Sequence, residues 1–432
     1  MPKRSVNIVS LGCSKNLVDS ERLMRMLSDV GFAVSFESET PHHDIVVINT
    51  CGFIGDAKEE SINSILAWAE AKNRGDIKQL VVMGCLTQRY MDELKEEIPE
   101  VDRWYGKTDW VNMATDLSKQ YPGSAPYDRV ITTPRHHAYL KVAEGCNRFC
   151  AFCAIPLITG RFRSRSVEQL VEEARMLASR GVKELNVIAQ DLSSYGKDLY
   201  GKCELARLVD ALADVEGIRW IRLHYLYPAD FPMDLLDVMA RRPNVCKYLD
   251  LALQHSSDTV LGNMRRHITA AETEELLEKI RAAVPGIHIR TTLMVGFPGE
   301  GEAEFADLME FVRKQRFERM GAFAYCEEEG TYAANNLPDS IDPEVKQQRL
   351  DQLMALQEEI SASVQDSKVG SRMKVIVDRE EPDYYVGRTE FDSPEVDPEV
   401  LIRKTRKMHP GEFVNVLIES AMPYELVARE AE

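Results

Sequence analysis

Three cysteines in the segment CNRFCAFC, Cys146, Cys150 and Cys153, are the residues whose spacing points most clearly to chemistry. Three thiolates on one short loop can bind three irons of a four-iron, four-sulfur cluster and leave the fourth iron open to a substrate or cofactor. A structural zinc site usually closes all four positions with paired cysteine knuckles, and a ferredoxin cluster has a fourth cysteine. The spacing therefore predicts an open 4Fe–4S cluster. The alternative is three unrelated buried thiols, since a free cysteine behaves as a small apolar side chain.

Three further cysteines each lie just beyond a predicted buried strand in the first part of the chain. Ligands of open α/β sheets bind beyond the carboxyl ends of the strands, so thiols at these positions should converge. This placement predicts a second cluster site with three cysteine ligands, and the alternative is three core thiols at strand ends. The remaining three cysteines show no ligand spacing and are predicted to be structural. The thiols with a preceding strand are Cys13 after 6–11, Cys51 after 44–49 and Cys85 after 79–83, and the others are Cys203, Cys246 and Cys326.

Alternating apolar runs and amphipathic stretches predict the elements that position these cysteines. Up to about Leu117, short strands alternate with helices such as 19–31 and 57–71, which indicates a doubly wound, Rossmann-like parallel sheet. After a connector at 120–137, six strands, most of them followed by a helix, predict a partial (βα)6 barrel. The first of these strands leads directly into CNRFCAFC, at the face where barrel active sites form.

The last part of the chain has a different pattern. A long polar helix at 343–366 is followed by short strands and turns, which predict a small all-β barrel. The expected fold class is therefore α/β with an added β barrel. We expect three domains, at residues 3–118, 132–362 and 366–432.

The composition is typical of a soluble globular chain. Of its 432 residues, 44% are hydrophobic and 28% are charged. No stretch approaches the ~20 apolar residues of a membrane span, and the N-terminus lacks the apolar core of a signal peptide. We therefore expect a cytoplasmic protein with no membrane partner. Thiols stay reduced in that compartment, so the cysteines are expected to be ligands rather than disulfides.

The formal net charge of −17 bears on the kind of partner. Nucleic-acid binding normally rests on Lys and Arg that neutralise phosphates, so this charge disfavours RNA, although a local basic patch could still bind it. An acidic surface attracts and steers a basic protein. The charge thus fits a basic protein partner better than RNA, while solubility alone would also account for it.

Several longer segments match a known family. GCNRFCAFCAIPLITGRFRSRS (145–166) has the sequence of a cluster loop and the stretch after it, and LALQHSSDTVLGNMRR and TTLMVGFPGE fit the same family. With these segments and the order of the three domains, the whole chain resembles the radical S-adenosylmethionine methylthiotransferases, whose C-terminal barrel is a TRAM domain. SLGCSKNLVDSE (Ser10–Glu21) and NTCGFIGDAKEESI (Asn49–Ile62) resemble the branch that modifies a ribosomal protein. The tRNA branch typically shows a GCQMN-like sequence at the first of these segments and lacks GFI at the second.

The resemblance implies an activity and its cofactors. The branch adds a methylthio group to the β-carbon of one aspartate in a small-subunit ribosomal protein, number twelve. Two 4Fe–4S clusters and S-adenosylmethionine (SAM) are implied, because replacing an unactivated C–H bond needs radical chemistry that a cofactor must supply. The cluster of the CNRFCAFC loop would bind SAM and cleave it to the radical that abstracts hydrogen. The second cluster would present the sulfur, a second SAM would donate the methyl group, and flavodoxin or ferredoxin would be a suitable electron donor.

Four polar or aromatic residues are expected near the cofactor by their positions. Phe152 lies within the cysteine loop and could pack beside the adenine, or could only anchor the loop. Gln190 ends the second barrel strand, and Gln254 and His255 end the fourth. All three should point toward the active face, and the alternative is that they are satisfied polar groups of the barrel rim.

Two glycines and three arginines complete the candidate set. Gly296 and Gly299 in VGFPGE would let the backbone approach the nucleoside closely, or would only form turns. Arg161, Arg163 and Arg165 follow the cysteine loop and could hold a substrate carboxylate, although an exposed charged strand is the alternative.

Other functions stay open at this point. The closest is the same chemistry on an adenosine of tRNA. The tail disfavours it, because RKTRK (403–407) is its only basic run, and residues 366–432 hold 10 Lys and Arg against 15 Asp and Glu. The acidic segments DREEPD and EFDSPEVDPE suit a basic ribosomal protein better. A non-catalytic iron–sulfur electron carrier would need closed clusters with four ligands, and a zinc-binding interaction protein is the weakest alternative.

Overall fold

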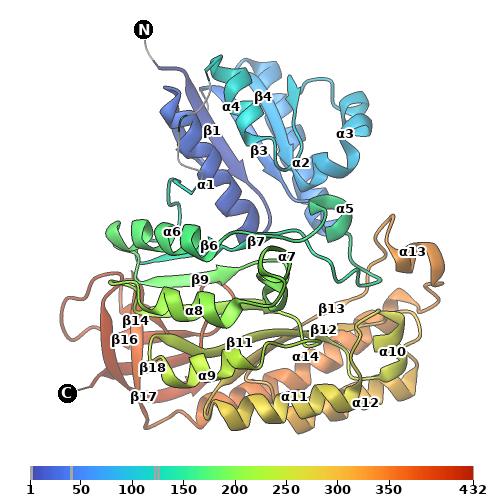
Figure 1. The fold of residues 1–432 in the computed structure, drawn as a ribbon, viewed down its shortest axis with the longest axis vertical. Coiled ribbons are helices and arrows are strands. Elements are labelled where there is room, and N and C mark those ends of the chain that lie inside the picture. The colour runs from blue at the N-terminus through green and yellow to red at the C-terminus, as the bar shows by residue number, and fades with distance from the viewer. Residues whose placement is uncertain (1–2, 39–41, 121–122, 124–126, 432) are drawn as a thin grey trace. The chain divides into compact units, whose positions relative to one another are not determined.

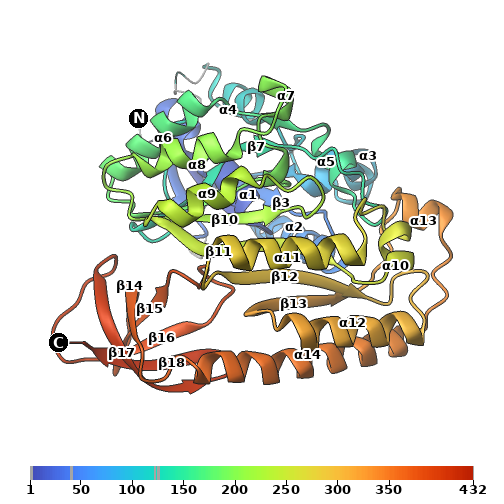
Figure 2. The same ribbon diagram turned by 60° about the horizontal axis from the view of Figure 1, so that its bottom comes forward.

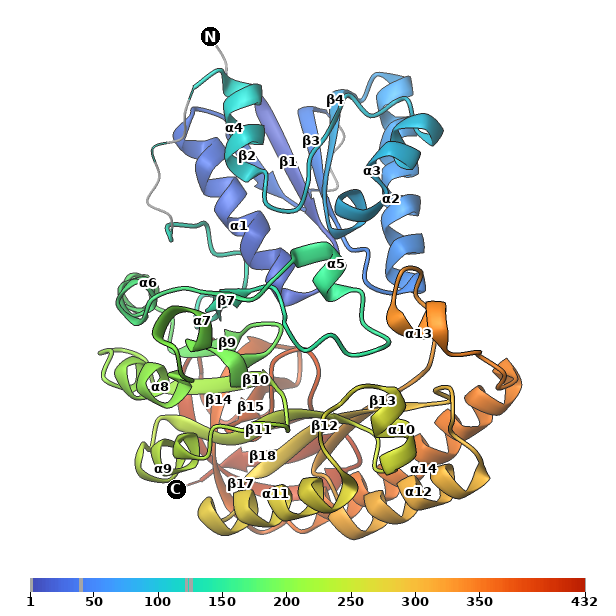
Figure 3. The same ribbon diagram turned by 45° about the vertical axis from the view of Figure 1, so that its right-hand side comes forward.

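The computed structural model describes residues 3–38, 42–120, 123 and 127–431 of the chain. This part folds as two compact units, which Figures 1 to 3 show from three sides. The cysteine loop contributes to both, since Cys146 and Cys153 belong to the first unit and Cys150 to the second. The first unit comprises the described residues of Met1–Thr133, with Glu144–Asn147 and Cys153–Phe162, and the second comprises Pro134–Ala143, Arg148–Phe152 and the described residues from Arg163 onward.

A five-stranded parallel sheet in the order β2-β1-β3-β4-β5 forms the centre of the first unit. Strands β3 and β4 are near-continuous runs of buried aliphatic residues, as strands covered on both faces must be. The predicted doubly wound sheet is confirmed. The edge strands β2 and β5 were not predicted, because four and two residues are too few to show a clear apolar period. The strands are β1 (Ser5–Ser10), β2 (Ala33–Phe36), β3 (His43–Thr50), β4 (Ile77–Gly84) and β5 (Arg103–Trp104).

Helices cover both faces of this sheet, as Figure 3 shows. α1 and α4 pack on the face of Ile45 and Val47, whereas α2 and α3 pack on the face of Val46 and Ile48. Within the predicted connector, residues 121–122 and 124–126 lie outside the described residues. The helices of this unit are α1 (Ser14–Asp29), α2 (Gly55–Arg74), α3 (Cys85–Glu97), α4 (Trp110–Ser118) and α5 (Ile155–Thr159).

Six parallel strands, in the order β13-β12-β11-β10-β9-β6, form the larger part of the second unit. Figure 2 labels β10 to β13 of this sheet. Each strand pairs with the one before it in this set, as in an open (βα)6 barrel, so that prediction is confirmed. The strands are β6 (His137–Lys141), β9 (Glu184–Ile188), β10 (Trp220–Leu226), β11 (Val245–Gln254), β12 (His288–Val295) and β13 (Arg319–Ala324), and two short strands, β7 (Ala143–Glu144) and β8 (Arg163–Ser164), flank the cysteine loop.

Helices connect these strands, and several of them begin at clear capping signals. Thr269 and Glu272 form a reciprocal capping box at the start of α11, and Asp342 caps α14, which has the predicted bounds. Within the described ranges, no helix combines the length and the apolar character needed to cross a membrane. The helices are α6 (Val167–Ser179), α7 (Lys197–Tyr200), α8 (Leu205–Ala213), α9 (Asp234–Arg241), α10 (Asp258–Asn263), α11 (Ala270–Ala283), α12 (Glu302–Gln315), α13 (Tyr332–Asn336) and α14 (Pro343–Asp366), with a 3-10 turn η1 (Leu192–Ser194).

The C-terminal strands close into a small barrel, β14-β15-β16-β18-β17. In β17 every second residue from Val414 to Ile418 is buried, which is the period of a strand with one face toward a core. The predicted all-β barrel is confirmed, and the unpredicted strand β18 closes it by pairing in parallel with β16. The strands are β14 (Arg372–Glu380), β15 (Tyr384–Thr389), β16 (Glu399–Arg403), β17 (Phe413–Met422) and β18 (Glu425–Glu430).

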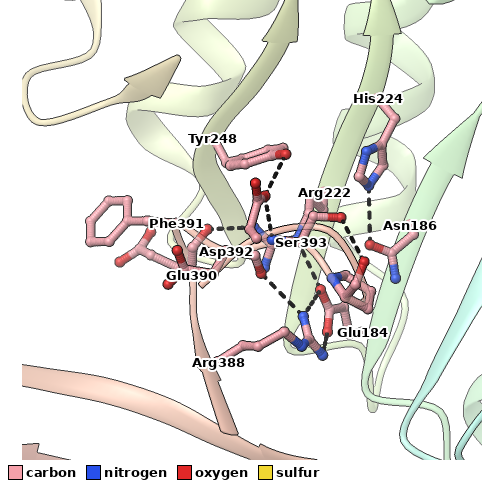
Figure 4. A network of polar contacts seen from close by, with 12 residues as sticks. Glu184, Asn186, Arg222, His224, Tyr248, Arg388, Glu390, Phe391, Asp392 and Ser393 are labelled. Carbon is pink, nitrogen blue, oxygen red and sulfur yellow. Dashed lines mark hydrogen bonds and ion pairs between the residues drawn. The ribbon is translucent and has the colours of Figure 1, made fainter. Parts of the chain in front are cut away.

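A buried charge network joins this barrel to the parallel strands of the same unit (Figure 4). Glu184, the first residue of β9, is fully buried between two arginines: Arg222 Nε lies 3.0 Å from Oε1, and Arg388 Nη2 of β15 lies 2.7 Å from Oε2. Burial alone would raise the pKa of Glu184, but Arg388 and Arg222 hold it well below its usual range. The two barrels therefore share one set of mutually neutralised charges.

The β15–β16 loop (residues 390–398) lies against the amino-terminal ends of the parallel strands. Arg222 Nη1 donates to the carbonyl of Glu390 (2.7 Å), and Tyr248 donates from its hydroxyl to Asp397 Oδ2 (2.8 Å). Asp392, which is 1% exposed, pairs with Arg319. Two of the acidic residues expected to attract a basic partner, Asp392 and Asp397, are thus already paired inside the protein. These two carboxylates are therefore not available to a basic partner, because the half-buried Arg290 pairs with Asp397 and the buried Arg319 pairs with Asp392.

Candidate functional site

The loops that follow β1, β3 and β4 meet at the carboxyl edge of the first sheet. Gly12 has a φ of +87°, and a Cβ at that position would lie 2.8 Å from Cys51 Sγ. At Gly52 a Cβ would lie 2.9 Å from the carbonyl carbon of Cys85. Glycine is required where backbones approach this closely. The structure therefore brings Cys13, Cys51 and Cys85 together beside the β1–β3 switch point, where ligands of this strand order bind.

Asn16 ties these three loops together. Its side chain is 1% exposed and donates from Nδ2 to the carbonyls of Leu11 (3.1 Å) and Thr50 (2.9 Å). Its Oδ1 accepts a weak bond from the Cys85 thiol (3.6 Å), and its own carbonyl accepts from Asn49 Nδ2 (3.0 Å). One amide thus contacts the ends of all three strands, which makes Asn16 a positioning residue for the cysteine site.

A buried lysine, paired with two carboxylates, lies beside the three thiols. Lys107 is 3% exposed, and its Nζ lies 2.9 Å from Asp19 Oδ2 and 3.8 Å from Glu144 Oε1. Burial raises the pKa of Cys85 to about 12, although Lys107 acts to lower it. The pKa of Cys13 is lowered, because Lys15, Lys107 and nearby backbone amides together outweigh desolvation by the surrounding protein.

Burial and the neighbouring Cys13 raise the pKa of the Cys51 thiol, although backbone amides of Phe53 and Gly52 oppose the shift. Cys13 thus differs from Cys51 and Cys85, whose thiols are buried. Metal ligation requires thiolates, so binding a cluster here must release protons from the buried pair.

The segment that follows the cysteine loop packs close to the same site within the first unit. The backbone N–H of Cys146 donates to the carbonyl of Gly160 (3.2 Å). Cys85 shares an apolar cluster with Ala154 and Ile158, the residues that directly follow Cys153 and form α5. Cys85 therefore lies beside the segment that directly follows Cys153.

Cys150, in the second unit, lies among cationic side chains. Arg266 is 3% exposed, and its Nη1 lies 3.3 Å from Cys150 Sγ, while the thiol donates to the Tyr227 hydroxyl oxygen (3.9 Å). The guanidinium groups of Arg266 and Arg148 lie 4.0 and 4.1 Å from the centre of the Tyr227 ring. Asp191 accepts from Arg148 Nε (2.7 Å) and fixes that arginine. A cluster bound through Cys150 would thus receive an N–H···S hydrogen bond from a buried arginine.

We expect the R266Q substitution to lower the midpoint potential of the cluster bound through Cys150. Hydrogen bonds and positive charge near a cluster sulfur favour the reduced, more negative state. The potential is measured by a reductive titration followed by electron paramagnetic resonance, in a variant whose Cys13, Cys51 and Cys85 are alanine so that one cluster remains. R266K, which keeps the charge, should shift it less.

The matched control for this prediction is R265Q. Arg265 neighbours Arg266 in sequence, and its guanidinium carbon lies 3.2 Å from the centre of the Tyr332 ring. An unchanged potential in R266Q, or an equal shift in R265Q, would contradict a role for the Arg266–Cys150 contact.

Of the residues expected at the barrel rim, the two glutamines lie at the carboxyl ends of strands, whereas Phe152 and His255 are held by contacts within the protein. Phe152 packs edge-to-face on Phe297 with ring centres 6.2 Å apart, so it does anchor the loop to the barrel. Gln190 lies two residues beyond β9, and Gln254 is the last residue of β11, so both are at the carboxyl ends. His255 is fully buried: its Nε2 lies 3.1 Å from Glu300 Oε2, and its Nδ1 accepts from the Ser257 N–H (2.9 Å). These contacts favour the alternative of a satisfied rim residue for His255.

Gly296 and Gly299 both have positive φ, and their open faces are filled by protein. A Cβ at Gly296 would lie 2.3 Å from Lys346 Cγ, and one at Gly299 would lie 2.3 Å from Asn263 Nδ2. The room left by the missing Cβ at each glycine is therefore taken up by the side chains of Lys346 and Asn263. The turn that they form is held by Glu300, which accepts from the Gly296 N–H (2.9 Å).

The arginines after the cysteine loop also differ. Arg161 and Arg163 are exposed, and Arg165 donates to Glu173 (2.6 Å) and to the carbonyl of Lys141 (3.1 Å).

Of the cysteines predicted to be structural, Cys246 is 1% exposed in a cluster with Trp220, Cys203 is half-buried and Cys326 is exposed. The burial of Cys246 supports a structural role for that thiol. The exposure of Cys326 does not support such a role.

The donor set at Cys13, Cys51 and Cys85 fits an iron–sulfur cluster. Within the described ranges, no three His, Cys, Asp or Glu side chains converge on one metal-ion position. In a four-iron cluster each thiolate binds a different iron, so the sulfurs need not converge on a point. Three soft thiolate donors with a buried cation nearby suit such a cluster better than a closed zinc site, which needs four ligands.

Several of these residues were not singled out from the sequence. Asn16 lies in SLGCSKN and Arg266 in LGNMRR, both of which were matched as family segments, so a closer reading of those segments could have found them. Arg148 lies within CNRFCAFC itself, whereas Lys107 and Tyr227 carry no local signal. Those two reach the cysteines because the fold places loops distant in sequence side by side.

Comparison with protein families identifies all three parts of the chain. Residues 5–106 match the uncharacterized protein family UPF0004, residues 140–312 match the radical SAM superfamily, and residues 369–430 match the TRAM domain.

Curated relatives match the chain over its whole length. Proteins named ribosomal protein uS12 methylthiotransferase RimO are 57% identical in Phocaeicola vulgatus and in Porphyromonas gingivalis, each match covering 99% of this chain and 99% of the relative. The protein of that name in Flavobacterium johnsoniae is 49% identical over 100% of this chain and 99% of its own length.

Solved structures share the fold at low identity. The radical SAM methyltransferase TsrM from Kitasatospora setae has a TM-score of 0.55 and 15% identity, and the match covers 75% of this chain and 72% of that chain. The cobalamin-dependent radical enzyme OxsB has a TM-score of 0.54 and 13% identity, covering 83% of this chain and 56% of that chain. These structures support the architecture of the chain and say nothing of its substrate.

Proposed function

Because this chain belongs to the family of ribosomal protein uS12 methylthiotransferases, we propose that it adds a methylthio group to the β-carbon of one aspartate in that ribosomal protein. It is a radical SAM enzyme that works with 4Fe–4S clusters and SAM. The observation that carries the proposal is 57% identity over 99% of both chains, which leaves no domain of the relatives unmatched.

Six cysteines are proposed to hold the two clusters. Cys146, Cys150 and Cys153 would hold the one that, when bound, supplies the electron for reductive cleavage of SAM. Cys13, Cys51 and Cys85 would hold the second, which supplies a site for the sulfur that is transferred. Within the first unit, Cys85 packs against the segment that follows Cys153.

The surrounding residues have distinct roles in this proposal. Asn16 orients the loops of the second site, and Lys107 supplies positive charge beside its thiols. Arg266 donates to the sulfur of Cys150. Phe152, Gln190, Gln254, Gly296 and Gly299 remain candidates for SAM contact, and their places at the carboxyl ends of the strands support that assignment most for the two glutamines.

The domain limits and the other partners belong to the same proposal. The domains are placed at residues 3–118, 132–362 and 366–432, in line with the family matches at 5–106, 140–312 and 369–430. A reductant such as flavodoxin or ferredoxin would deliver the electron, and the reaction would take place in the cytoplasm, where ribosomal proteins are made.

RNA binding is at most secondary. In the basic run of the tail, Arg403 pairs with Glu419 (3.0 Å), Lys404 with Glu380 (2.8 Å) and Arg406 with Glu430 (2.8 Å). Cations already paired with carboxylates have little net charge to offer a phosphate backbone. The relatives' names point to a ribosomal protein, so modification of tRNA is not favoured.

The proposal is tested by an anaerobic assay of the reconstituted enzyme with SAM, sulfide and a strong reductant. Purified uS12 and unmodified tRNA are supplied in separate reactions, and both are followed by mass spectrometry. We expect a methylthio mass gain on one aspartate of uS12 and none on tRNA. A gain on tRNA alone, or SAM cleavage with neither macromolecule modified, would refute the assigned substrate.

A further inference from the structure

Tyr225, near the carboxyl end of β10, has a backbone angle that aromatic residues rarely adopt. Its φ is +62°, and at such angles a Cβ crowds the backbone. Between Leu223 and Leu226 this strand advances three residues, whereas the neighbouring β11 advances two, from Leu249 to Leu251. The extra residue forms a β-bulge, a feature that changes the direction of a side chain and is frequent beside active sites.

The bulge directs the Tyr225 side chain across the inner face of the open barrel. In the sheet order, β6 and β12 each lie two strands from β10, on opposite sides of it. Burial and Glu395 raise the pKa of Tyr139 on β6, and Tyr225 raises it further. Burial lowers the pKa of Arg290 on β12, but Asp250 and weaker neighbours, Tyr225 among them, raise it overall. One phenol can act on both strands only from the interior of the barrel.

This part of the inner face is partly open. Every second residue of β12 from Ile289 to Val295 is fully buried, and the residues between them are partly exposed. Helices cover the outer face of such a barrel, so the partly exposed residues line its inner face. Phe323 of β13 pairs with Met294 of that set and is 56% exposed, and Tyr225 itself is 36% exposed. The inner face therefore offers large apolar and aromatic side chains to a substrate.

Neighbouring contacts hold Tyr225 in place beside the cysteine loop. Its N–H donates to Asp250 Oδ2 (3.1 Å), and its ring centre lies 5.9 Å from that of His224. Two residues further along, which is roughly 7 Å of extended chain, the Tyr227 hydroxyl accepts from the Cys150 thiol (3.9 Å). Backbone strain clusters at catalytic sites and ligand clamps, where it contributes to function.

We propose that the ring of Tyr225 contacts the target aspartate and limits how far its side chain enters the barrel, so that the β-carbon lies at the reacting position. This inference rests on the proposed function, because it takes an aspartate of uS12 as the substrate. The carboxylate is one bond beyond the β-carbon and would meet the phenol first, whose O–H can donate to it. A side chain longer by one methylene, as in glutamate, would be stopped with its β-carbon displaced. Tyr225 is therefore a specificity-determining residue.

The test uses the Y225G and Y225F variants of the full-length enzyme with both clusters reconstituted. Glycine adopts a φ of +62° without strain, so Y225G removes the ring and should still fold, whereas Y225F removes only the hydroxyl. The matched control is Y200F, at a half-buried tyrosine of α7 whose hydroxyl accepts from the Val167 N–H (3.1 Å). The substrates are uS12 and a uS12 variant whose target aspartate is replaced by glutamate. We measure kcat/KM for both substrates, the 5′-deoxyadenosine formed per methylthio product, and thermal unfolding.

We expect Y225G to lower the preference for aspartate over glutamate about tenfold or more, the usual worth of one methylene in a substrate site. It should form more 5′-deoxyadenosine per methylthio product, because the target side chain is no longer held, while SAM cleavage without uS12 stays as in the unchanged enzyme. Its unfolding temperature should stay close to that of the unchanged enzyme, because relief of backbone strain offsets the lost contacts of a partly exposed ring.

The Y225F variant separates the ring from its hydroxyl. It should keep the preference for aspartate, because the ring is still present. Its kcat/KM for uS12 should fall on the order of tenfold, as expected when a hydrogen bond to a charged group is lost. Y200F should leave the preference, the product ratio and the unfolding temperature unchanged.

Each contrary result has a separate meaning. If the unchanged enzyme methylthiolates uS12 and Y225G keeps the same preference for aspartate, the role of Tyr225 is overturned and the proposed function stands. A fall in unfolding temperature with equal loss of activity toward both substrates would make Tyr225 a structural residue and would also overturn that role. If the unchanged enzyme does not modify uS12, the proposed function fails, and this inference fails with it.

Discussion

Replacing Cys13, Cys51 and Cys85 together by alanine is expected to abolish methylthio transfer while SAM cleavage continues. The physical reason is that the two sets of thiols are placed by different elements. The first set lies at the ends of β1, β3 and β4, where Asn16 and three glycine-lined loops hold it. The other set lies on the loop before α5, and Cys85 of the first set packs on Ala154 and Ile158, which follow that loop.

The measurement follows three products of one reaction. Methylthio transfer to uS12 should fall by on the order of 10³-fold or more, because removal of a bound group that carries the chemistry leaves no substitute for it. Formation of 5′-deoxyadenosine should stay within about twofold. Bound iron should fall from about eight to about four atoms per chain, as one cluster of four irons is lost.

Two controls define this result. C326A removes an exposed cysteine outside both sets and should leave all three readings unchanged. Replacing Cys146, Cys150 and Cys153 should abolish SAM cleavage and transfer together. If the Cys13/Cys51/Cys85 variant retained both its iron and its transfer activity, these thiols would be core residues at strand ends, the alternative that the sequence left open.

The R388A substitution is expected to destabilise the second unit by about 3–5 kcal/mol, the usual loss when one partner of a buried ion pair is removed. Arg388 has a 3% exposed side chain, and without it the carboxylates of Glu184 and Asp378 lose their strongest shared partner. Unfolding by urea, followed by tryptophan fluorescence, measures the loss, since Trp220 packs against Phe413 where the two barrels meet.

A surface pair and a double variant serve as controls for this prediction. Arg403 is 59% exposed and pairs with Glu419, so R403A should change stability by less than ~1 kcal/mol. The double variant E184M/R388M removes both partners and should recover part of the loss, because no unpaired charge of that pair is left in the interior. Equal stability of R388A and R403A would show that the network does not hold the barrels together.

The same network predicts how stability depends on pH. The pKa of Glu184 is held below its usual range by Arg388 and Arg222 against the effect of burial, and Arg319 and Lys368 act in the same way on Asp392. A carboxyl whose pKa is lowered on folding stabilises the protein above the ordinary carboxyl pKa, and this contribution is lost as the pH falls toward the lowered value. R388A should therefore lose less stability on acidification than the unchanged protein does.

Much of the architecture could be predicted from the sequence because its signals are local. The buried runs that became β1, β3 and β4 are continuous and apolar, and helix α14 has the predicted bounds 343–366. The spacing of Cys146, Cys150 and Cys153 lies within one loop, so its chemistry could be proposed before any fold was known. The convergence of Cys13, Cys51 and Cys85 could also be predicted from the sequence, since the carboxyl ends of parallel strands lie at one edge of the sheet.

Only the tertiary structure decided what surrounds these thiols and which charges are available to a partner. Arg266 reaches Cys150 from a loop 116 residues away in sequence, and Lys107 reaches Asp19 across 88 residues. In sequence Asp392 and Glu395 belong to one acidic run, yet Asp392 is buried against Arg319 and Glu395 is exposed. Periodicity and composition report which face of an element is apolar, but the partner of a polar side chain depends on contacts between distant segments, and those exist only in the folded chain.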